Sequence, residues 1–270
     1  MKKPSSLIKW TGSKRNLSLS IYDYFPQANR YFEPFIGGGS MLFLASSKYE
    51  QCYASDIYQP LIKFWQEIKS SPEAVVNNYK VDWERLQEDF PNYYYEVRSR
   101  FNQSPNAQDL VFLSRTCVNG IIRFNRSGEF NNSLHVSRRG MTPSNYKKIV
   151  DEWSPKLKNA TFDCKDYTAI LSDVKEGDFV YLDPPYANSK NRYIQHLDIE
   201  KLYDFLRQLN AKNVMWAMSF DGTRGESDLI ENIPQDLYKR FHLINAGNSS
   251  VKNVLSSTKE TVHEALYLNY

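Results

Sequence analysis

The stretch FVYLDPPY, residues 179–186, joins four apolar residues directly to an acid, two prolines and a tyrosine. The apolar residues are typical of a short buried strand, and the prolines end it because they cannot donate to a sheet ladder. The turn would therefore lie at the carboxyl end of a strand, where open α/β sheets place their ligand sites. There the carboxylate of Asp183 and the carbonyl of Pro184 would be fixed acceptors beside the ring of Tyr186. This set suits a planar ring with an exocyclic amine, although proline pairs are also common in ordinary turns.

Strands and helices alternate along the chain on both sides of this stretch. Further strands are predicted at residues 30–36, 51–55, 161–164, 214–219, 241–246 and 262–268, and helices at 41–45, 57–69 and 198–210. The alternation predicts an α/β fold with a doubly wound, Rossmann-like sheet. Residues 71–148 interrupt it with a mainly helical region and a Ser127-Gly128 turn pair that is typical of a hairpin. We therefore predict one domain from residues 1–70 and 149–270, with an inserted lobe between them.

Composition limits the classes of protein that fit. Of the 270 residues, 41% are hydrophobic, and no run approaches the ~20 apolar residues of a membrane span. The first residues lack the apolar core of a signal peptide. The three cysteines are widely spaced, which fits neither a disulfide framework nor a metal site. We expect a cytoplasmic protein with reduced thiols, no metal and no membrane partner.

Positive charge is concentrated in one part of the chain. Residues 110–148 hold seven basic residues and one acidic residue, a net charge of +6, whereas the whole chain carries +3. Such a concentration is typical of a surface that binds a polyanion. A solvated charged face is the alternative interpretation.

A second motif, EPFIGGGS, spans residues 33–40. Its three glycines let the backbone approach a ligand closely, and the helix predicted after them offers unpaired N–H groups. Asp56 follows Gly39 by 17 residues, a position where an acid accepts bonds from ribose hydroxyls. The loop is not a GxGxxG fingerprint, so a nucleoside without pyrophosphate, such as S-adenosylmethionine, fits it better than a dinucleotide. A glycine turn followed by a helix-capping aspartate is the alternative interpretation.

The chain carries, in this order, KWTGSK (9–14), the glycine loop, RTCVNGIIRFNRSGEFN (115–131), DPPY (183–186) and SSTKETVHEAL (256–266). This series resembles the blocks of the Dam-like, alpha-group adenine-N6 DNA methyltransferases, and the resemblance covers nearly the whole chain. It implies a Rossmann-like, S-adenosylmethionine-dependent methyltransferase sheet with an inserted target-recognition region. It also implies transfer of the methyl group to N6 of an adenine that is flipped out of duplex DNA.

The resemblance further implies roles for individual residues. It places a S-adenosylmethionine site at Trp10, Lys14, Phe35, Gly37, Gly39, Ser40, Asp56, Asp166, Tyr167 and Asp183. Within this site, Asp56 would take the ribose hydroxyls, while Asp166 and Tyr167 would contact the adenine of the cofactor. The catalytic residues would be Asp183 and Pro184, which accept hydrogen bonds from the target amine, and Tyr186, which stacks on the base.

The basic segment would supply the contacts with DNA, because arginine and asparagine make bidentate contacts with bases in the major groove. We predict contacts with DNA, some to bases and some to phosphates, by Arg115, Asn119, Arg123, Asn125, Arg126, Arg138 and Arg139. Family members that act on GATC continue the Phe-Asn pair with a Val-Pro-Phe-Gly-like stretch. Here residues 132–135 read Asn-Ser-Leu-His, so the recognition sequence stays open.

Two other functions compete with this one. The first is methylation of RNA adenine or of a protein glutamine, although glutamine methyltransferases favour Asn at the position of Asp183 and lack the Lys-Trp block. The second is a DNA-binding module without activity, which the retention of Asp183, Tyr186 and Asp56 disfavours. We expect a monomer acting in a restriction–modification system, or as a phage or solitary methylase. A cognate endonuclease would share its DNA site without being a stable subunit.

Overall fold

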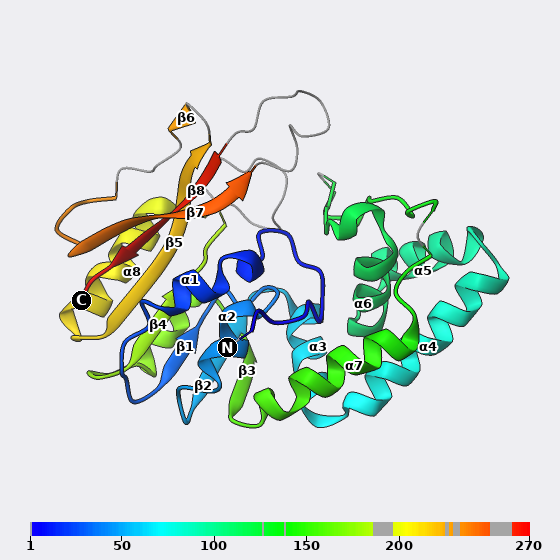
Figure 1. Ribbon diagram of the computed structural model, residues 1–270, viewed down its shortest axis with the longest axis horizontal. Helices are drawn as coiled ribbons and strands as arrows, with labels where there is room; N and C mark the ends of the chain where they lie inside the picture. Colours follow the sequence, from blue (N-terminus) through cyan, green and yellow to red (C-terminus); the bar gives the residue numbers. More distant parts are fainter. Residues whose placement is uncertain are drawn as a thin grey trace.

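The computed structural model describes residues 2–125, 127–137, 139–185, 197–224, 227–228, 233–248 and 261–270. Within these ranges, eight strands form one sheet (Figure 1). They are β1 (Tyr31–Glu33), β2 (Cys52–Asp56), β3 (Ala160–Cys164), β4 (Phe179–Leu182), β5 (Met215–Arg224), β6 (Ser227–Asp228), β7 (Arg240–Asn248) and β8 (Thr261–Leu268). Their order is β3-β2-β1-β4-β5-β8-β7, and β6 pairs with β5.

The strand order reverses at the centre of the sheet. Strands β3, β2, β1, β4 and β5 are parallel, and β8 lies antiparallel between β5 and β7. The chain moves outward from β1 to β3 and then returns to β4, on the other side of β1. In open α/β sheets this reversal is where ligands bind, at the carboxyl ends of the strands. The predicted Rossmann-like α/β sheet is confirmed.

Helices cover both faces of the sheet. They are α1 (Ser18–Tyr22), α2 (Ser40–Ala45), α3 (Gln59–Ser70), α4 (Pro72–Glu88), α5 (Asn92–Gln103), α6 (Ala107–Thr116), α7 (Pro143–Trp153) and α8 (Ile199–Ala211), with 3₁₀ helices η1 (Lys14–Asn16), η2 (Val118–Gly120), η3 (Ser154–Leu157) and η4 (Tyr167–Ser172). Tyr31 and Tyr181 pack into one core with α1 to α3, whereas Phe32 and Val180 pack into a second core with η4 and α8. Burial on both faces explains why β4 is apolar throughout.

Helices α4 to α7 form a group beside the sheet, next to α3 (Figure 1). After α6 the chain makes a short hairpin, in which Phe124 pairs with Phe130 around the predicted Ser127-Gly128 turn. The mainly helical lobe with a hairpin is thus confirmed as a structural feature. Its limits at 70/71 and 148/149 stay predictions; the first lies at the end of α3 and the second inside α7. None of the described helices is both long and apolar enough to cross a bilayer.

Candidate active site

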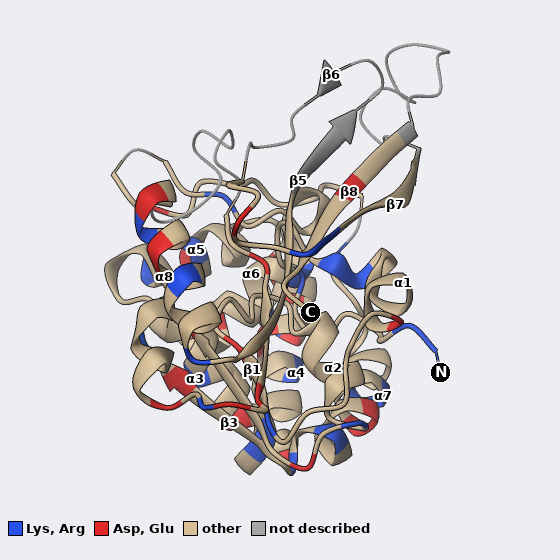
Figure 2. Ribbon diagram, turned by 90° about the vertical axis from the view of Figure 1, so that its left-hand side faces the viewer, with Lys and Arg blue, Asp and Glu red and all other residues tan. Residues whose placement is uncertain are grey.

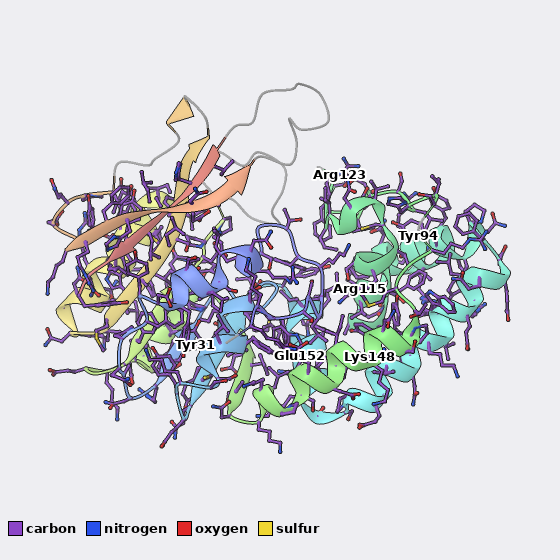
Figure 3. The ribbon with its side chains drawn as sticks, viewed as in Figure 1. Tyr31, Tyr94, Arg115, Arg123, Lys148 and Glu152 are labelled. Carbon is purple, nitrogen blue, oxygen red and sulfur yellow. The ribbon has the colours of Figure 1, made fainter. Side chains whose placement is uncertain are left out.

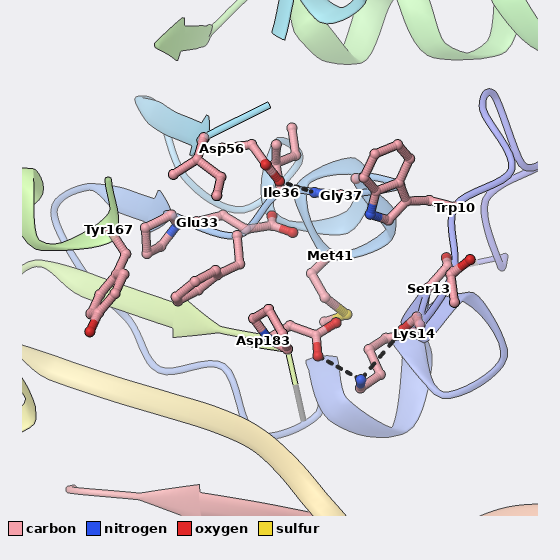
Figure 4. Close-up of a pocket in the computed structure, with 18 of the residues that line it drawn as sticks. Trp10, Ser13, Lys14, Glu33, Ile36, Gly37, Met41, Asp56, Tyr167 and Asp183 are labelled. Atoms are coloured by element: carbon pink, nitrogen blue, oxygen red, sulfur yellow. Dashed lines mark hydrogen bonds and ion pairs between the residues drawn. The ribbon is translucent and has the colours of Figure 1, made fainter. Parts of the chain in front are cut away.

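A pocket of about 200 Å³ opens where β1, β2 and β4 end. The ten residues predicted to hold a cofactor all lie in its wall: Trp10, Lys14, Phe35, Gly37, Gly39, Ser40, Asp56, Asp166, Tyr167 and Asp183. Figure 4 shows Glu33, Asp56 and Asp183 directed into this cavity from three neighbouring strands. The sheet therefore brings together residues that are up to 173 positions apart in the sequence.

Glycines shape the loop between β1 and α2 because two tryptophan rings lie against it. Gly37 and Gly39 have φ of +44° and +67°, a region that favours glycine. A Cβ at Gly37 would lie 2.8 Å from the Trp10 ring, and one at Gly39 would lie 2.6 Å from the Trp65 ring. The Trp65 Nε1–H also donates to the Gly37 carbonyl at 3.2 Å. The loop backbone is therefore held tightly at one end of the pocket, next to Trp10.

Asp56, the last residue of β2, joins this loop to the start of α3. Its Oδ2 accepts from the Gly37 N–H at 3.3 Å and its Oδ1 from the Tyr58 N–H at 3.1 Å. Burial raises the pKa of Asp56 to about 6, and the backbone hydrogen bonds oppose that rise. Because the carboxylate also borders the pocket, it can accept further bonds from hydroxyl groups of a ligand.

An aromatic pair lies across the pocket from Trp10. The rings of Phe35 and Tyr167 stack with centroids 5.1 Å apart. Asp166 caps η4 by accepting from the Thr168 backbone N–H at 3.1 Å. Lys201 of α8 donates to the same carboxylate at 3.2 Å, and its Nζ lies 5.4 Å from the Tyr167 ring centre. This end of the pocket offers flat apolar surface beside a carboxylate, which suits a planar heterocycle.

Asp183 follows β4 and is held by a buried lysine. Lys14, which is 5% exposed, donates to its Oδ1 at 2.6 Å and lies 3.3 Å from the carboxylate of Glu264 in β8. Burial raises the pKa of Asp183 to about 6; Glu264 adds to the rise and Lys14 opposes it. Pro184 is buried beside it, and the predicted residue Tyr186 lies outside the described residues.

Glu33, Lys201 and Glu264 are site residues that sequence reasoning did not select. Glu33 is 3% exposed, lines the pocket and accepts from the Tyr31 hydroxyl at 2.8 Å. Its position as the first letter of EPFIGGGS was a usable signal, because an acid at a strand end commonly faces a ligand site. Glu264 lies in the SSTKETVHEAL block, but its partner Lys14 is 250 residues away in the sequence. No local sequence signal identifies Lys201 as a site residue, apart from its place in the first turn of α8.

The lobe closes one side of the pocket. Ile122 and Phe124, which follow η2, belong to the pocket wall. Thr11 donates to the Ile122 carbonyl at 3.1 Å, and the Phe124 ring meets Tyr58 edge-on with centroids 5.7 Å apart. The hairpin that was predicted to contact DNA therefore touches the same pocket as the cofactor residues.

Arg115 does not lie on the surface. It is 7% exposed, its Nη2 donates to the carbonyls of Ser6 and Leu7, and its guanidinium lies 5.2 Å from the Tyr146 ring centre. Figure 3 shows Arg115 inside the lobe and Arg123 at its outer edge. A guanidinium held in this way cannot also reach a base or a phosphate in this structure. We therefore assign Arg115 a structural role instead of the predicted contact with DNA.

The other predicted DNA contacts fall into three groups. Arg123 and Arg139 are exposed, and so is Asn119, whose φ is +57°. The Arg123 Nε donates to the side chain of Asn131 at 2.9 Å, and Arg139 lies 4.2 Å from the Phe90 ring centre. Asn125 uses its own side chain to close the hairpin turn. Arg126 and Arg138 lie outside the described residues.

Residues 110–148 carry charge of mostly one sign in the sequence, unlike α8. Along α8, for example, acidic and basic side chains are interleaved (Figure 2). The exposed members Arg123 and Arg139 remain candidates for contact with DNA.

Comparison with known proteins identifies the family. The model of the D12 class N6 adenine-specific DNA methyltransferases matches residues 10–250. A DNA adenine methylase of Vibrio cholerae serotype O1 is 31% identical over 191 residues, which are 69% of this chain and 67% of that protein. The Type II methyltransferase M.MjaIII of Methanocaldococcus jannaschii is 28% identical over 300 residues, covering 97% of this chain and 98% of the relative.

A third relative is also similar over almost the full length of both chains. The Type II methyltransferase M1.LlaDCHI of Lactococcus lactis subsp. cremoris is 27% identical over 283 residues, covering 97% of this chain and 94% of the relative. The family match spans both the pocket residues and the basic segment. The chain therefore belongs to the D12 class of N6 adenine-specific DNA methyltransferases.

Proposed function

We propose that this enzyme transfers the methyl group of S-adenosylmethionine to N6 of an adenine flipped out of duplex DNA, with Asp183 holding the target amine. The family supports the reaction. One observation supports the assignment of residues: Asp183 shares a single pocket with the aromatic pair, Asp56 and the glycine loop. Donor and acceptor can therefore meet within one cavity, as a direct transfer requires.

The residues present fit the proposed cofactor. Phe35 and Tyr167 offer a flat surface for its adenine, and Asp56 offers a carboxylate for vicinal hydroxyls. Gly37 and Gly39 let the loop backbone line the pocket, because a Cβ at either position would clash with the ring of Trp10 or Trp65. When bound, S-adenosylmethionine supplies a methyl group on a positively charged sulfur.

Asp183 and Pro184 would act on the target amine. The nitrogen of an aromatic amine is a weak nucleophile, because its lone pair is delocalised into the ring. Hydrogen bonds from its N–H groups to the Asp183 carboxylate and the Pro184 carbonyl favour the tetrahedral, nucleophilic form. Lys14 engages Oδ1 of Asp183, so we assign the amine to Oδ2. The carboxylate also stabilises the positive charge that develops on the attacking nitrogen.

The target base would reach this turn by leaving the duplex, because a base stacked in the duplex cannot reach a carboxylate inside the pocket. Ile122 and Phe124 lie on the side of the pocket that the lobe covers, and we propose that they face the flipped base. Stacking by Tyr186 on that base remains part of the proposal. Exposed arginines of the lobe, Arg123 and Arg139, would hold the DNA on either side.

The test is transfer of a labelled methyl group from S-adenosylmethionine to duplex DNA, RNA or protein, followed by hydrolysis and identification of the product. We expect N6-methyladenine in duplex DNA. Asp183→Ala should lower the single-turnover rate by about 10³-fold or more, the scale seen when a preorganised polar contact is removed. The variant should fold, because Lys14 keeps its ion pair with Glu264.

Two results would refute the proposal. Incorporation of the label into RNA or protein instead of DNA would show that DNA is not the substrate. An Asp183→Ala enzyme with nearly normal activity would remove Asp183 from the chemistry. Sequencing of the methylated positions in the same product would identify the recognition sequence.

We also propose that the enzyme acts as a monomer, since one flipped base needs one pocket. The Type II names of two relatives support a restriction–modification setting, with a separate endonuclease that cuts the same site. Protection of the methylated DNA against such an endonuclease, and sedimentation of the enzyme with and without DNA, would test these two points.

A further inference from the structure

The lobe contains a backbone bulge, residues 119–122, between two paired positions. The N–H of Val118 donates to the carbonyl of Ser133 at 2.9 Å, and the carbonyl of Arg123 accepts from the N–H of Asn131 at 3.1 Å. Between these positions the first segment has four residues, and the segment that faces it has one. The longer segment must therefore leave the line of the pairing, as in a β-bulge.

The bulge begins with a tight turn that few residue types adopt. Its central residues, Asn119 and Gly120, have φ of +57° and +64°, and the Ile121 N–H donates to the Val118 carbonyl at 3.3 Å. Positive φ at both central positions is typical of a type I′ turn, for which Asn-Gly is a preferred sequence. A residue other than glycine keeps such a φ where the surrounding structure holds it. Asn119 is exposed at this turn.

Asn132 holds the turn from its inner side. It is 8% exposed, and its Nδ2 donates to the carbonyls of Val118 and Ile121, both at 2.9 Å. Because these are the first and last residues of the turn, one amide group joins its two ends. The backbone of Asn132 is fixed as well, since its carbonyl accepts from the Tyr94 hydroxyl at 3.0 Å and from Arg98 at 3.3 Å. The turn is thus fastened to the interior of the lobe.

The bulge connects the surface of the lobe with the pocket. At its start, Asn119 is exposed within the basic segment. At its end, Ile122 lines the pocket, and its carbonyl accepts from the Thr11 hydroxyl at 3.1 Å. Asparagine reads a base through two directed hydrogen bonds, so such a contact depends on the position of the backbone that carries it. The amide of Asn132 fixes that position.

We infer that Asn132 is a positioning residue for sequence recognition: its side-chain amide holds the bulge so that Asn119 meets one base pair of the DNA site. The inference rests on the proposed function, because it takes duplex DNA as the substrate. Asn132 is also the first residue of the stretch 132–135, in which this chain departs from the family members that act on GATC. The clamp therefore lies where the lobe of this chain differs from theirs.

The test is methylation of duplexes with randomised base pairs on both sides of one adenine, followed by sequencing of the methylated products. Asn132→Leu keeps the size of the side chain and removes both amide donors. We expect it to lower the preference at one base pair about tenfold, the scale of a bidentate base contact. Asn119→Gly, which tolerates the positive φ, should lower the preference at the same base pair. The double variant should lower it no further, because the clamp acts through Asn119.

Asn102→Leu is the matched control, because the Asn102 amide also clasps the backbone of the lobe. Its Nδ2 donates to the Phe130 carbonyl at 3.1 Å, and its Oδ1 accepts from the Phe130 N–H at 2.8 Å, outside residues 119–122. Both leucine variants lose hydrogen bonds to the backbone, so both should unfold at a lower urea concentration than the wild type. The control should keep the wild-type preference at every base pair.

Asn132→Ala removes the same donors without adding bulk, and it replaces the leucine variant if that protein is insoluble. Wild-type preferences in a soluble Asn132 variant or in Asn119→Gly would overturn the inference. A loss that is spread over all base pairs, or that adds to the loss in Asn119→Gly, would overturn it too. Insolubility of both Asn132 variants beside a soluble Asn102→Leu would leave Asn132 a structural role alone. Failure of the wild type to methylate any duplex would instead overturn the proposed function, and this inference with it.

Discussion

The pocket and the basic segment of the lobe place their predicted residues in different ways. In the pocket, ten residues chosen from the sequence line one cavity. In the lobe, Arg115 is buried, Asn125 closes its own turn, and Arg123 and Arg139 are exposed. The pocket residues were taken from the family resemblance and the lobe residues from their type within the basic segment, and only the first set converges. The difference shows which kind of motif allows the position of a residue in the fold to be predicted.

The pocket residues converge because parallel strands end at one edge of the sheet. Each of the first four strands delivers a carboxylate there: Glu33 ends β1, Asp56 ends β2, Asp166 follows β3 and Asp183 follows β4. Once a strand is recognised in the sequence, the sheet fixes where its last residue lies. A residue in an irregular segment has no such rule, because its position depends on tertiary packing.

The largest expected effect concerns Arg115. Arg115→Ala should lower the free energy of unfolding by about 3 kcal/mol, since it leaves a cavity and two carbonyls, one buried and one partly buried, without their donor. Those carbonyls belong to Ser6 and Leu7, in the segment that leads to Trp10 and Lys14. Urea denaturation of the enzyme without ligands measures the change.

Arg123→Ala is the matched control from the same segment. Its guanidinium is exposed and bonded to Asn131, a contact that contributes little to stability. The control should unfold like the wild type and bind DNA more weakly. An Arg115→Ala protein with normal stability but weakened DNA binding would return Arg115 to the DNA interface, and the contrast between pocket and lobe would lose its clearest case.

The sequence allowed most of the sheet to be predicted, together with the cofactor side of the site. Alternation and the strand-end motifs sufficed for β1 to β4, because each is short and followed by a turn. The burial of Arg115 could not be predicted from its neighbours, since the partner carbonyls are more than 100 residues away. The same holds for Glu264, which meets Lys14 only because β8 lies antiparallel beside β5.

The predicted lobe also shows what local sequence signals cannot predict. Helix α7 begins with Pro143 at its first turn, a usual helix start, yet the predicted domain limit falls inside it. A limit drawn from composition marks where the charge pattern changes. It does not mark where a helix ends, because a helix at the border of two units can pack against both.

A smaller effect tests the pocket side of the comparison. Asp56→Ala should weaken S-adenosylmethionine about 10- to 100-fold, the range for losing hydrogen bonds to a charged group. Asp163→Ala, at an exposed carboxylate of β3 outside the pocket wall, should change the affinity less than about twofold. Equilibrium titration with the cofactor measures both. If Asp56→Ala bound the cofactor normally, lining the pocket would not be enough to identify a cofactor residue.

The smallest expected effect is a pH dependence of the chemical step. The pKa of Asp183 is raised to about 6, so the carboxylate takes up a proton as the pH falls through this value. A protonated Asp183 no longer offers the charge that stabilises the attacking amine. The single-turnover rate of the enzyme bound to DNA and saturated with cofactor should therefore fall about twofold between pH 7.5 and pH 6. Saturation with cofactor keeps the titration of Asp56 from entering the measurement.

Glu264→Gln sharpens this test, because the charge of Glu264 raises the pKa of Asp183. Without that charge, Lys14 keeps its ion pair with Asp183 and nothing from Glu264 opposes ionisation, so the pH at which half of the rate is lost should move downward. A rate that stays constant down to pH 5 in the wild type would show that Asp183 keeps its charge or does not need it. A shift upward in the variant would show that Glu264 acts mainly by holding Lys14 in place. Either result would mean that Lys14 and Glu264 do not control the pKa of Asp183 in the way that the structure predicts.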